Sequence, residues 1–153
     1  MEFHLRPMRW RDLPGIARWR YPNEYAIYDT SLAELAGGLL AQFIVMPSVG
    51  RVYYTVTDEH SQIVGIFSIY RRGADTVEIG LGLRPDLTGQ GAGLAFVRAG
   101  MDYAREHYHP RLFRLYVLAW NQRAIRVYVA AGFHVVGNLP RGLAGRVEME
   151  CDA

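Results

Sequence analysis

Apolar residues recur along the chain with two different spacings, which predict short strands alternating with amphipathic helices. Strands are expected over residues 3–7, 51–57, 63–70, 77–83, 112–118, 133–136 and 146–150, where β-branched and aromatic residues gather between polar turns. Helices are expected near 12–20, 31–43, 94–108 and 122–130, where apolar side chains recur three and four residues apart. The order β-α-α-β-β-β-α-β-α-β-β predicts one α/β domain over residues 1–153, with a mixed sheet and helices on both faces.

Several helix ends carry typical capping residues. Asp12 precedes the first helix and can cap it. Ser31, with Glu34 three residues later, has the spacing of a capping box, and the helix that follows is expected to continue through Leu35, Leu39 and Leu40 towards Phe43. Gly132 is expected to end the last helix in the left-handed conformation.

Composition excludes several classes of protein. The net charge of +2 is too small to predict a nucleic-acid partner, and no apolar run is long enough to span a membrane. The N-terminus lacks the apolar region of a signal peptide, and Cys151 is the only cysteine, so we expect a cytoplasmic chain without disulfides. The five histidines show no metal-binding spacing, so no metal is expected.

A glycine-rich loop separates the predicted strand 77–83 from the predicted helix 94–108. Gly89, Gly91 and Gly93 stand at alternate positions just before that helix. Glycines let a bulky anion approach backbone N–H groups without meeting a Cβ, and a helix N-terminus attracts negative charge. Neither the lysine of a Walker loop nor the spacing of a dinucleotide fingerprint is present. The loop therefore predicts a diphosphate site of another kind.

Two motifs resemble the signatures of the GNAT family of N-acetyltransferases. The loop Thr88-x-x-Gly91-x-Gly93 is similar to the family's acetyl-CoA loop, Gln/Arg-x-x-Gly-x-Gly/Ala, with Thr88 in place of Gln or Arg. Downstream, Asn121-x-x-Ala124-x-x-x-Tyr128-x-x-x-Gly132-Phe133 resembles the second signature. The resemblance covers nearly the whole chain. It implies a GNAT-like, mostly antiparallel central sheet, splayed after its fourth strand, with the pantetheine arm of acetyl-CoA filling the wedge.

The resemblance also implies which residues hold acetyl-CoA as co-substrate. The diphosphate belongs at the loop, and the glycine-bearing strand offers backbone groups to the acetyl carbonyl and pantetheine. Asn121 shares a helix face with Tyr128, roughly 10 Å away along the axis, and is expected to contact the pantetheine. The expected set is Leu81, Gly82, Leu83, Thr88, Gly89, Gln90, Gly91, Ala92, Gly93, Leu94 and Asn121.

Catalytic candidates follow from the chemistry of acyl transfer to an amine. Tyr128 is expected to protonate the leaving thiolate, because a phenol has a pKa of about 10 and a thiol about 8.5; packing is the alternative role. Glu78, on the donor strand, is a candidate general base, and the alternatives are a surface glutamate or a water relay. A GNAT subgroup carries its base five residues before the Asn, where this chain has Tyr116.

The acceptor is expected to meet the aromatic segment 19–29, because the first helices cover the cleft mouth in the GNAT family. Trp19, Tyr21, Tyr25 and Tyr28 offer cation-binding faces or pack beneath a loop, and Glu24 and Asp29 could hold an ammonium group. We therefore expect acetyl-CoA-dependent N-acetylation of a small-molecule amine or a peptide N-terminus. A non-catalytic acyl-CoA-binding or sensing module is the alternative, and a homodimer is left open.

Overall fold

A central seven-stranded sheet organises the computed structural model, which describes residues 1–31, 33–37, 50–138 and 145–153. The strands lie in the order β1-β2-β3-β4-β5-β7-β6, and every neighbouring pair is antiparallel except β4 and β5. Their bounds are β1 His4–Pro7, β2 Arg51–Thr57, β3 Ile63–Arg72, β4 Thr76–Leu83, β5 Leu112–Leu118, β6 His134–Asn138 and β7 Arg146–Asp152. The predicted mixed, mostly antiparallel sheet is confirmed.

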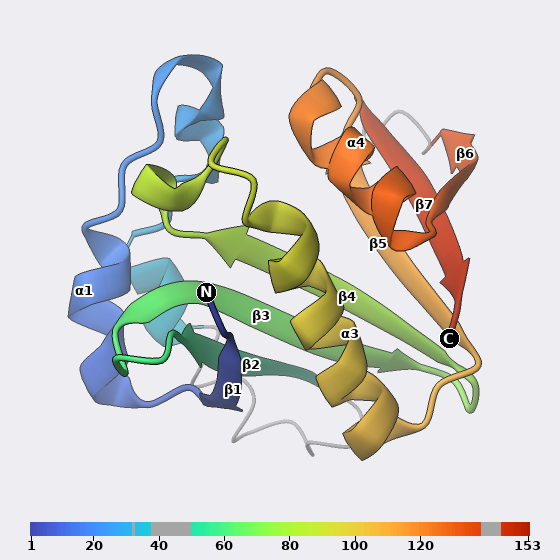
Figure 1. Cartoon of the computed structure of the whole chain (residues 1–153), viewed down its shortest axis with the longest axis horizontal. Coiled ribbons are helices and arrows are strands. Elements are labelled where there is room, and N and C mark those ends of the chain that lie inside the picture. The colour runs from blue at the N-terminus through green and yellow to red at the C-terminus, as the bar shows by residue number, and fades with distance from the viewer. Residues whose placement is uncertain (32, 38–49, 139–144) are drawn as a thin grey trace.

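Helices cover the sheet from two sides. The α-helices are α1 Leu13–Ala17, α3 Gly93–Tyr108 and α4 Gln122–Ala131, and the 3-10 turns are η1 Trp10–Asp12, η2 Asn23–Tyr28 and η3 Pro85–Leu87. Figure 1 shows α3 across β3 and β4, and α4 beside β5 and β7. No helix in the described residues is long and apolar enough to cross a membrane.

The sheet splits between β4 and β5. These parallel strands pair only where residues 76–78 face residues 112–114, and beyond that point they diverge (Figure 1). The splay predicted from the family resemblance is therefore present. It leaves the last five residues of β4 without a partner strand on the side of β5.

Two apolar cores lie on opposite faces of the sheet. The larger joins the sheet to α3 and α4 and contains Phe67, Phe96 and Phe113, each at most 1% exposed. The smaller packs α1 against the other face through Leu13 and Ile16. Alternation along the strands assigns each side chain to one core, so odd residues of β4 and β5 face α3 and α4.

The predicted helix ends are only partly correct. Ser31 and Glu34 form the expected capping box, because each side chain accepts a hydrogen bond from the other's N–H at 3.1 and 2.8 Å. Of that helix only 33–37 are described, and Leu39, Leu40 and Phe43 lie outside the described residues.

The prediction that Asp12 caps α1 through its side chain is wrong. Its carboxylate accepts bonds from Arg6, Thr55 and the Arg9 N–H instead, and so ties the N-terminal segment to the sheet.

Candidate active site

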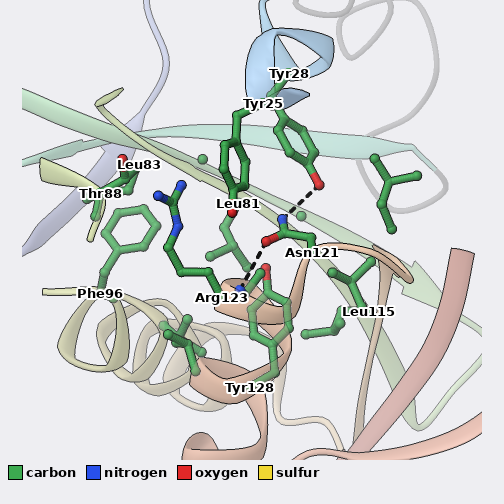
Figure 2. A pocket seen from close by; sticks show the side chains of 18 of the residues that line it. Tyr25, Tyr28, Leu81, Leu83, Thr88, Phe96, Leu115, Asn121, Arg123 and Tyr128 are labelled. Atoms are coloured by element: carbon green, nitrogen blue, oxygen red, sulfur yellow. Dashed lines mark hydrogen bonds between the residues drawn. The ribbon is translucent and has the colours of Figure 1, made fainter. Parts of the chain in front are cut away.

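A cavity of about 820 Å³ occupies the wedge between the diverging strands. This volume lies within the range of about 300–1,000 Å³ that is usual for small-molecule sites. Its walls come from the end of β4, the end of β5, the loop before α3, one face of α4 and the segment 19–30. Figure 2 shows how residues of these elements converge on it. The cavity therefore opens between the α3–α4 face and the α1 face of the sheet.

The glycine-rich loop forms one mouth of the cavity. Thr88, Gly89, Gly91, Gly93 and Leu94 line it, whereas Gln90 and Ala92 do not. Gly89 and Gly91 adopt φ of +71° and +83°, a region that L side chains rarely adopt, and a Cβ on Gly91 would meet no atom within 4 Å. The α3 N-terminus follows directly, without a side-chain cap. The loop thus presents backbone N–H groups beside open space, which suits an anionic diphosphate.

The end of β4 supplies an unpaired backbone edge. Leu81, Gly82 and Leu83 line the cavity, and β4 pairs with β5 only as far as Glu78. A peptide-like chain can hydrogen-bond to such an edge as a neighbouring strand would. One of these groups already has a partner, because the Tyr21 hydroxyl donates to the Leu83 carbonyl oxygen at 2.8 Å.

Asn121 is buried and uses both ends of its side-chain amide. Its Oδ1 accepts a hydrogen bond from the Ala124 N–H and so caps α4, while its Nδ2 donates to the Tyr28 hydroxyl at 2.9 Å (Figure 2). Asn121 therefore orients α4 and holds Tyr28 at the cavity. The expected contact with pantetheine would use its remaining amide hydrogen.

Tyr128 lies on the same face of α4 as Asn121 and Ala124, and all three line the cavity. Its ring packs edge-on against Phe133, and Figure 2 shows its hydroxyl pointing towards Asn121 and the aromatic segment. Within the described residues this hydroxyl makes no hydrogen bond. Burial, with a smaller contribution from Tyr28, raises the pKa of the phenol above its usual value, so it stays protonated at neutral pH.

Most of the predicted acceptor residues line the same cavity. Trp19, Tyr21, Tyr25 and Tyr28 all line the cavity, whereas Glu24 does not. The Tyr21 hydroxyl is held by its hydrogen bond to the Leu83 carbonyl oxygen. Burial, and to a smaller extent the negative charge of Asp29, raise the pKa of Tyr21 to about 12. The segment therefore combines one structural tyrosine with aromatic faces that border the cavity.

The structure does not bring Glu78 to the cavity. Glu78 is 6% exposed, and its carboxylate oxygens lie 2.7 Å from Arg51 and 2.8 Å from Arg72. It stands where β4 still pairs with β5, before the strands diverge. This placement corrects the expectation that it borders the substrate cleft, and the alternative of an exposed surface glutamate is also wrong.

Three arginines at the cavity were not predicted. Arg123 stacks over Tyr25, with its guanidinium carbon 4.1 Å from the ring centroid, and lies close to Gly89. Arg126 also comes from α4, and Arg146 begins β7. Arg123 lies off the helix face that Asn121 shares with Tyr128, so the spacing of the α4 motif did not indicate it. Arg146 depends on strand register, which the sequence does not reveal.

A family comparison gives these features a context. The sequence model described as the acetyltransferase (GNAT) domain matches residues 2–134. No curated protein is significantly similar to the chain in sequence.

Solved structures share the fold across almost the entire chain. A chimera of the Vibrio cholerae spermidine N-acetyltransferase SpeG and hSSAT has a TM-score of 0.77 at 19% identity, covering 99% of this chain and 96% of that one. SpeG from Vibrio cholerae in complex with CoA and spermine has a TM-score of 0.75 at 18% identity, covering 99% and 95%. AAC(6')-Ib in complex with ribostamycin and coenzyme A has a TM-score of 0.78 at 19% identity, covering 99% and 94%.

Proposed function

Because the chain belongs to the GNAT acetyltransferase family, an acetyl-CoA-dependent class of N-acetyltransferases, we propose that it acetylates a primary amine of a small molecule or peptide by direct attack on the thioester. The observation that carries the proposal is the cavity between β4 and β5. A glycine-rich anion loop, an aromatic segment and Tyr128 all line it.

The donor side fits acetyl-CoA in charge and shape. The loop 88–94 would hold the diphosphate through backbone N–H groups at the start of α3, a 16-residue helix. The Arg123 guanidinium, near Gly89, would add a positive charge at the same mouth. The free edge of β4 at Leu81, Gly82 and Leu83 would pair with the pantetheine amides and donate to the carbonyl oxygen that gains charge during attack.

Tyr128 is the proposed hydrogen-bond donor to the leaving sulfur. Its raised pKa keeps the proton on the phenol at neutral pH. Since a thiol ordinarily has a pKa of about 8.5, complete proton transfer from this phenol is uphill, and its main contribution is to stabilise charge as it builds on sulfur. The proton that finally resides on the thiol can come from the attacking ammonium or from solvent.

The amine does not need a carboxylate base in this site. Glu78, the candidate base on β4, is held by Arg51 and Arg72 outside the cavity. Position 116, where a GNAT subgroup carries its base, is a tyrosine here. The remaining alternative is a water relay. An apolar cavity lowers the pKa of a bound ammonium by desolvation, and nearby arginines lower it further. A neutral amine would therefore form by loss of a proton to water at the open mouth.

Thiol release separates this proposal from a binding module. Acetyl-CoA is incubated with the protein and a panel of primary amines, and free CoA thiol is followed together with the mass of the acetylated amine. An enzyme produces both in equal amounts at many turnovers. Tight acetyl-CoA binding by calorimetry, with no amine-dependent thiol release across the panel, would instead support the sensing module.

A further inference from the structure

The described lining of the cavity contains no acidic residue. Asp, Glu and His are all missing from it, whereas Arg123, Arg126 and Arg146 contribute positive charge. The segments outside the described residues, 32, 38–49 and 139–144, contain no Asp or Glu in the sequence either. A single copy of the chain therefore offers this cavity no side-chain carboxylate from any segment.

Carboxylates near the acceptor face are already held by arginines. Glu148 and Glu150 lie 2.7 and 2.8 Å from Arg114, and Glu78 lies between Arg51 and Arg72. Together these six side chains balance three negative charges with three positive ones. In the acceptor segment, the Asp29 carboxylate accepts a hydrogen bond from the Tyr21 N–H at 2.8 Å and lies 3.9 Å from Arg20, and Glu24 lies outside the cavity lining. The described lining itself therefore offers no negative side chain to attract a polycationic amine.

Arg146 is placed to meet the acceptor rather than the donor. It pairs directly with Leu118, and cross-strand partners share a face of the sheet. That face also carries Tyr116 and Gly82 and lies opposite the core of α3 and α4, because the neighbouring Val117 and Val147 are the buried residues. Arg146 makes no ion pair or hydrogen bond within the described residues, so its guanidinium is available to an anionic ligand.

From this placement we propose, resting on the proposed function, that the acceptor is a monoamine with an aromatic or apolar body and an anionic group, such as a carboxylate, that binds Arg146. The rings of Trp19 and Tyr28 would contact the body. Beside it, Ser68 packs over Gly80, and Ile66 and the Tyr21 hydroxyl lie over Gly82, so this wall of the acceptor side is built from small and apolar groups without a carboxylate. Polyamines and aminoglycosides, which the proteins of similar fold bind, are disfavoured because each additional ammonium would be buried beside arginine without a carboxylate.

A matched set of amines tests this assignment. The probes are phenethylamine, 4-(2-aminoethyl)benzoate, L-phenylalanine, spermidine and ribostamycin, each measured by thiol release and by calorimetric binding to the CoA-bound protein. We expect the better of the two carboxylated probes to exceed phenethylamine by about tenfold or more in kcat/KM, as a charge-assisted hydrogen bond provides. Spermidine and ribostamycin should be the poorest acceptors.

Substitution of Arg146 identifies the source of the preference. Arg146→Leu should remove the kcat/KM advantage of the carboxylated probe over phenethylamine. Arg146→Lys should restore part of that advantage. Arg111→Leu, at the exposed far end of β5, is the matched control and should change none of these values.

The outcomes separate this inference from the function on which it rests. Faster acetylation of spermidine than of every aromatic probe would overturn the inference and leave N-acetylation intact. An unchanged carboxylate preference in Arg146→Leu would overturn the role of Arg146. If no amine is acetylated, the proposed function fails, and calorimetry with the same probes still shows whether the cavity prefers an aromatic carboxylate over a polyamine.

Discussion

Replacing Tyr128 by phenylalanine removes the hydroxyl that we place beside the leaving sulfur. The ring and its edge-on contact with Phe133 remain, and no hydrogen bond within the described residues is lost. We therefore expect the free energy of unfolding to stay within about 0.5 kcal/mol of the wild-type value. Catalysis should respond differently, because the hydroxyl matters only when charge builds on sulfur.

The expected loss is in kcat. Removing one hydrogen-bond donor from a developing negative charge typically costs about 10²–10³ in rate, and water can replace part of it, so the rate should fall about ten- to a thousandfold. That range corresponds to about 1.4–4 kcal/mol of transition-state stabilisation. Acetyl-CoA affinity should change little, which places the loss in the chemical step. A thioester with a more acidic thiol should recover part of the rate, because its sulfur needs less stabilisation.

A second tyrosine provides the control. The hydroxyls of Tyr54 and Tyr108 lie 2.6 Å apart, away from the cavity. Tyr108→Phe removes one hydroxyl of the same kind and should lower the free energy of unfolding by about 1 kcal/mol, with kcat unchanged. Single-turnover thiol release at saturating amine isolates chemistry from product release in both variants. A wild-type single-turnover rate for Tyr128→Phe would refute the assignment and leave Tyr128 with a packing role.

Further predictions concern the donor loop, the aromatic segment and acid stability. Gly91→Val should abolish acetyl-CoA binding measured by calorimetry. The control is Gly73→Val in the β3–β4 turn: Gly73 has a similar φ of +70°, so the substitution should cause the same backbone strain of about 1–3 kcal/mol and leave acetyl-CoA binding normal. Equal acetyl-CoA affinity in the two variants would show that the anion does not bind at Gly91. Tyr25→Ala should raise the KM for amine several-fold, and Glu24→Ala should not, so equal effects would contradict the cavity lining. For Asp12, burial opposes ionisation, but bonds from Arg6, the Arg9 N–H and Thr55 outweigh it and lower the pKa to about 2. A lowered folded pKa stabilises the protein above the unfolded value of about 3.9, so about 2–3 kcal/mol should be lost as the pH falls from about 5 towards 2, and Asp12→Asn should flatten this acid limb in chemical denaturation.

Local sequence was enough to predict most of the elements and that the glycine-rich loop and the α4 motif would lie together at one cavity. The spacing of Asn121, Ala124 and Tyr128 determines a shared helix face, and helical geometry depends little on the rest of the fold. The glycines before α3 likewise predicted a loop there, and the structure shows that Gly89 and Gly91 adopt positive φ in it. These inferences use residues that are close in sequence, so they needed no knowledge of strand pairing.

The errors arose where partners are distant in sequence. Glu78 meets Arg51 from β2 and Arg72 from β3, and only the strand register brings the three together. Arg146 reaches the cavity because β7 inserts between β5 and β6, beside Leu118. Tyr21 lines the cavity as expected, but the sequence did not reveal that its hydroxyl donates to the carbonyl oxygen of Leu83, 62 residues later.

Segment 21–28 connects the two halves of the split sheet. Tyr21 donates to Leu83 at the end of β4, while Tyr28 accepts from Asn121 at the start of α4, on the β5 side. Beyond Glu78 the strands β4 and β5 do not pair, so the width of the wedge depends on such cross-links and on contacts between α3 and α4, such as Val127 against Gly93. An apolar wedge without them would gain by collapsing, since closing it would bury more apolar surface. The aromatic segment therefore forms one mouth of the site and also holds open the space in which donor and acceptor must meet.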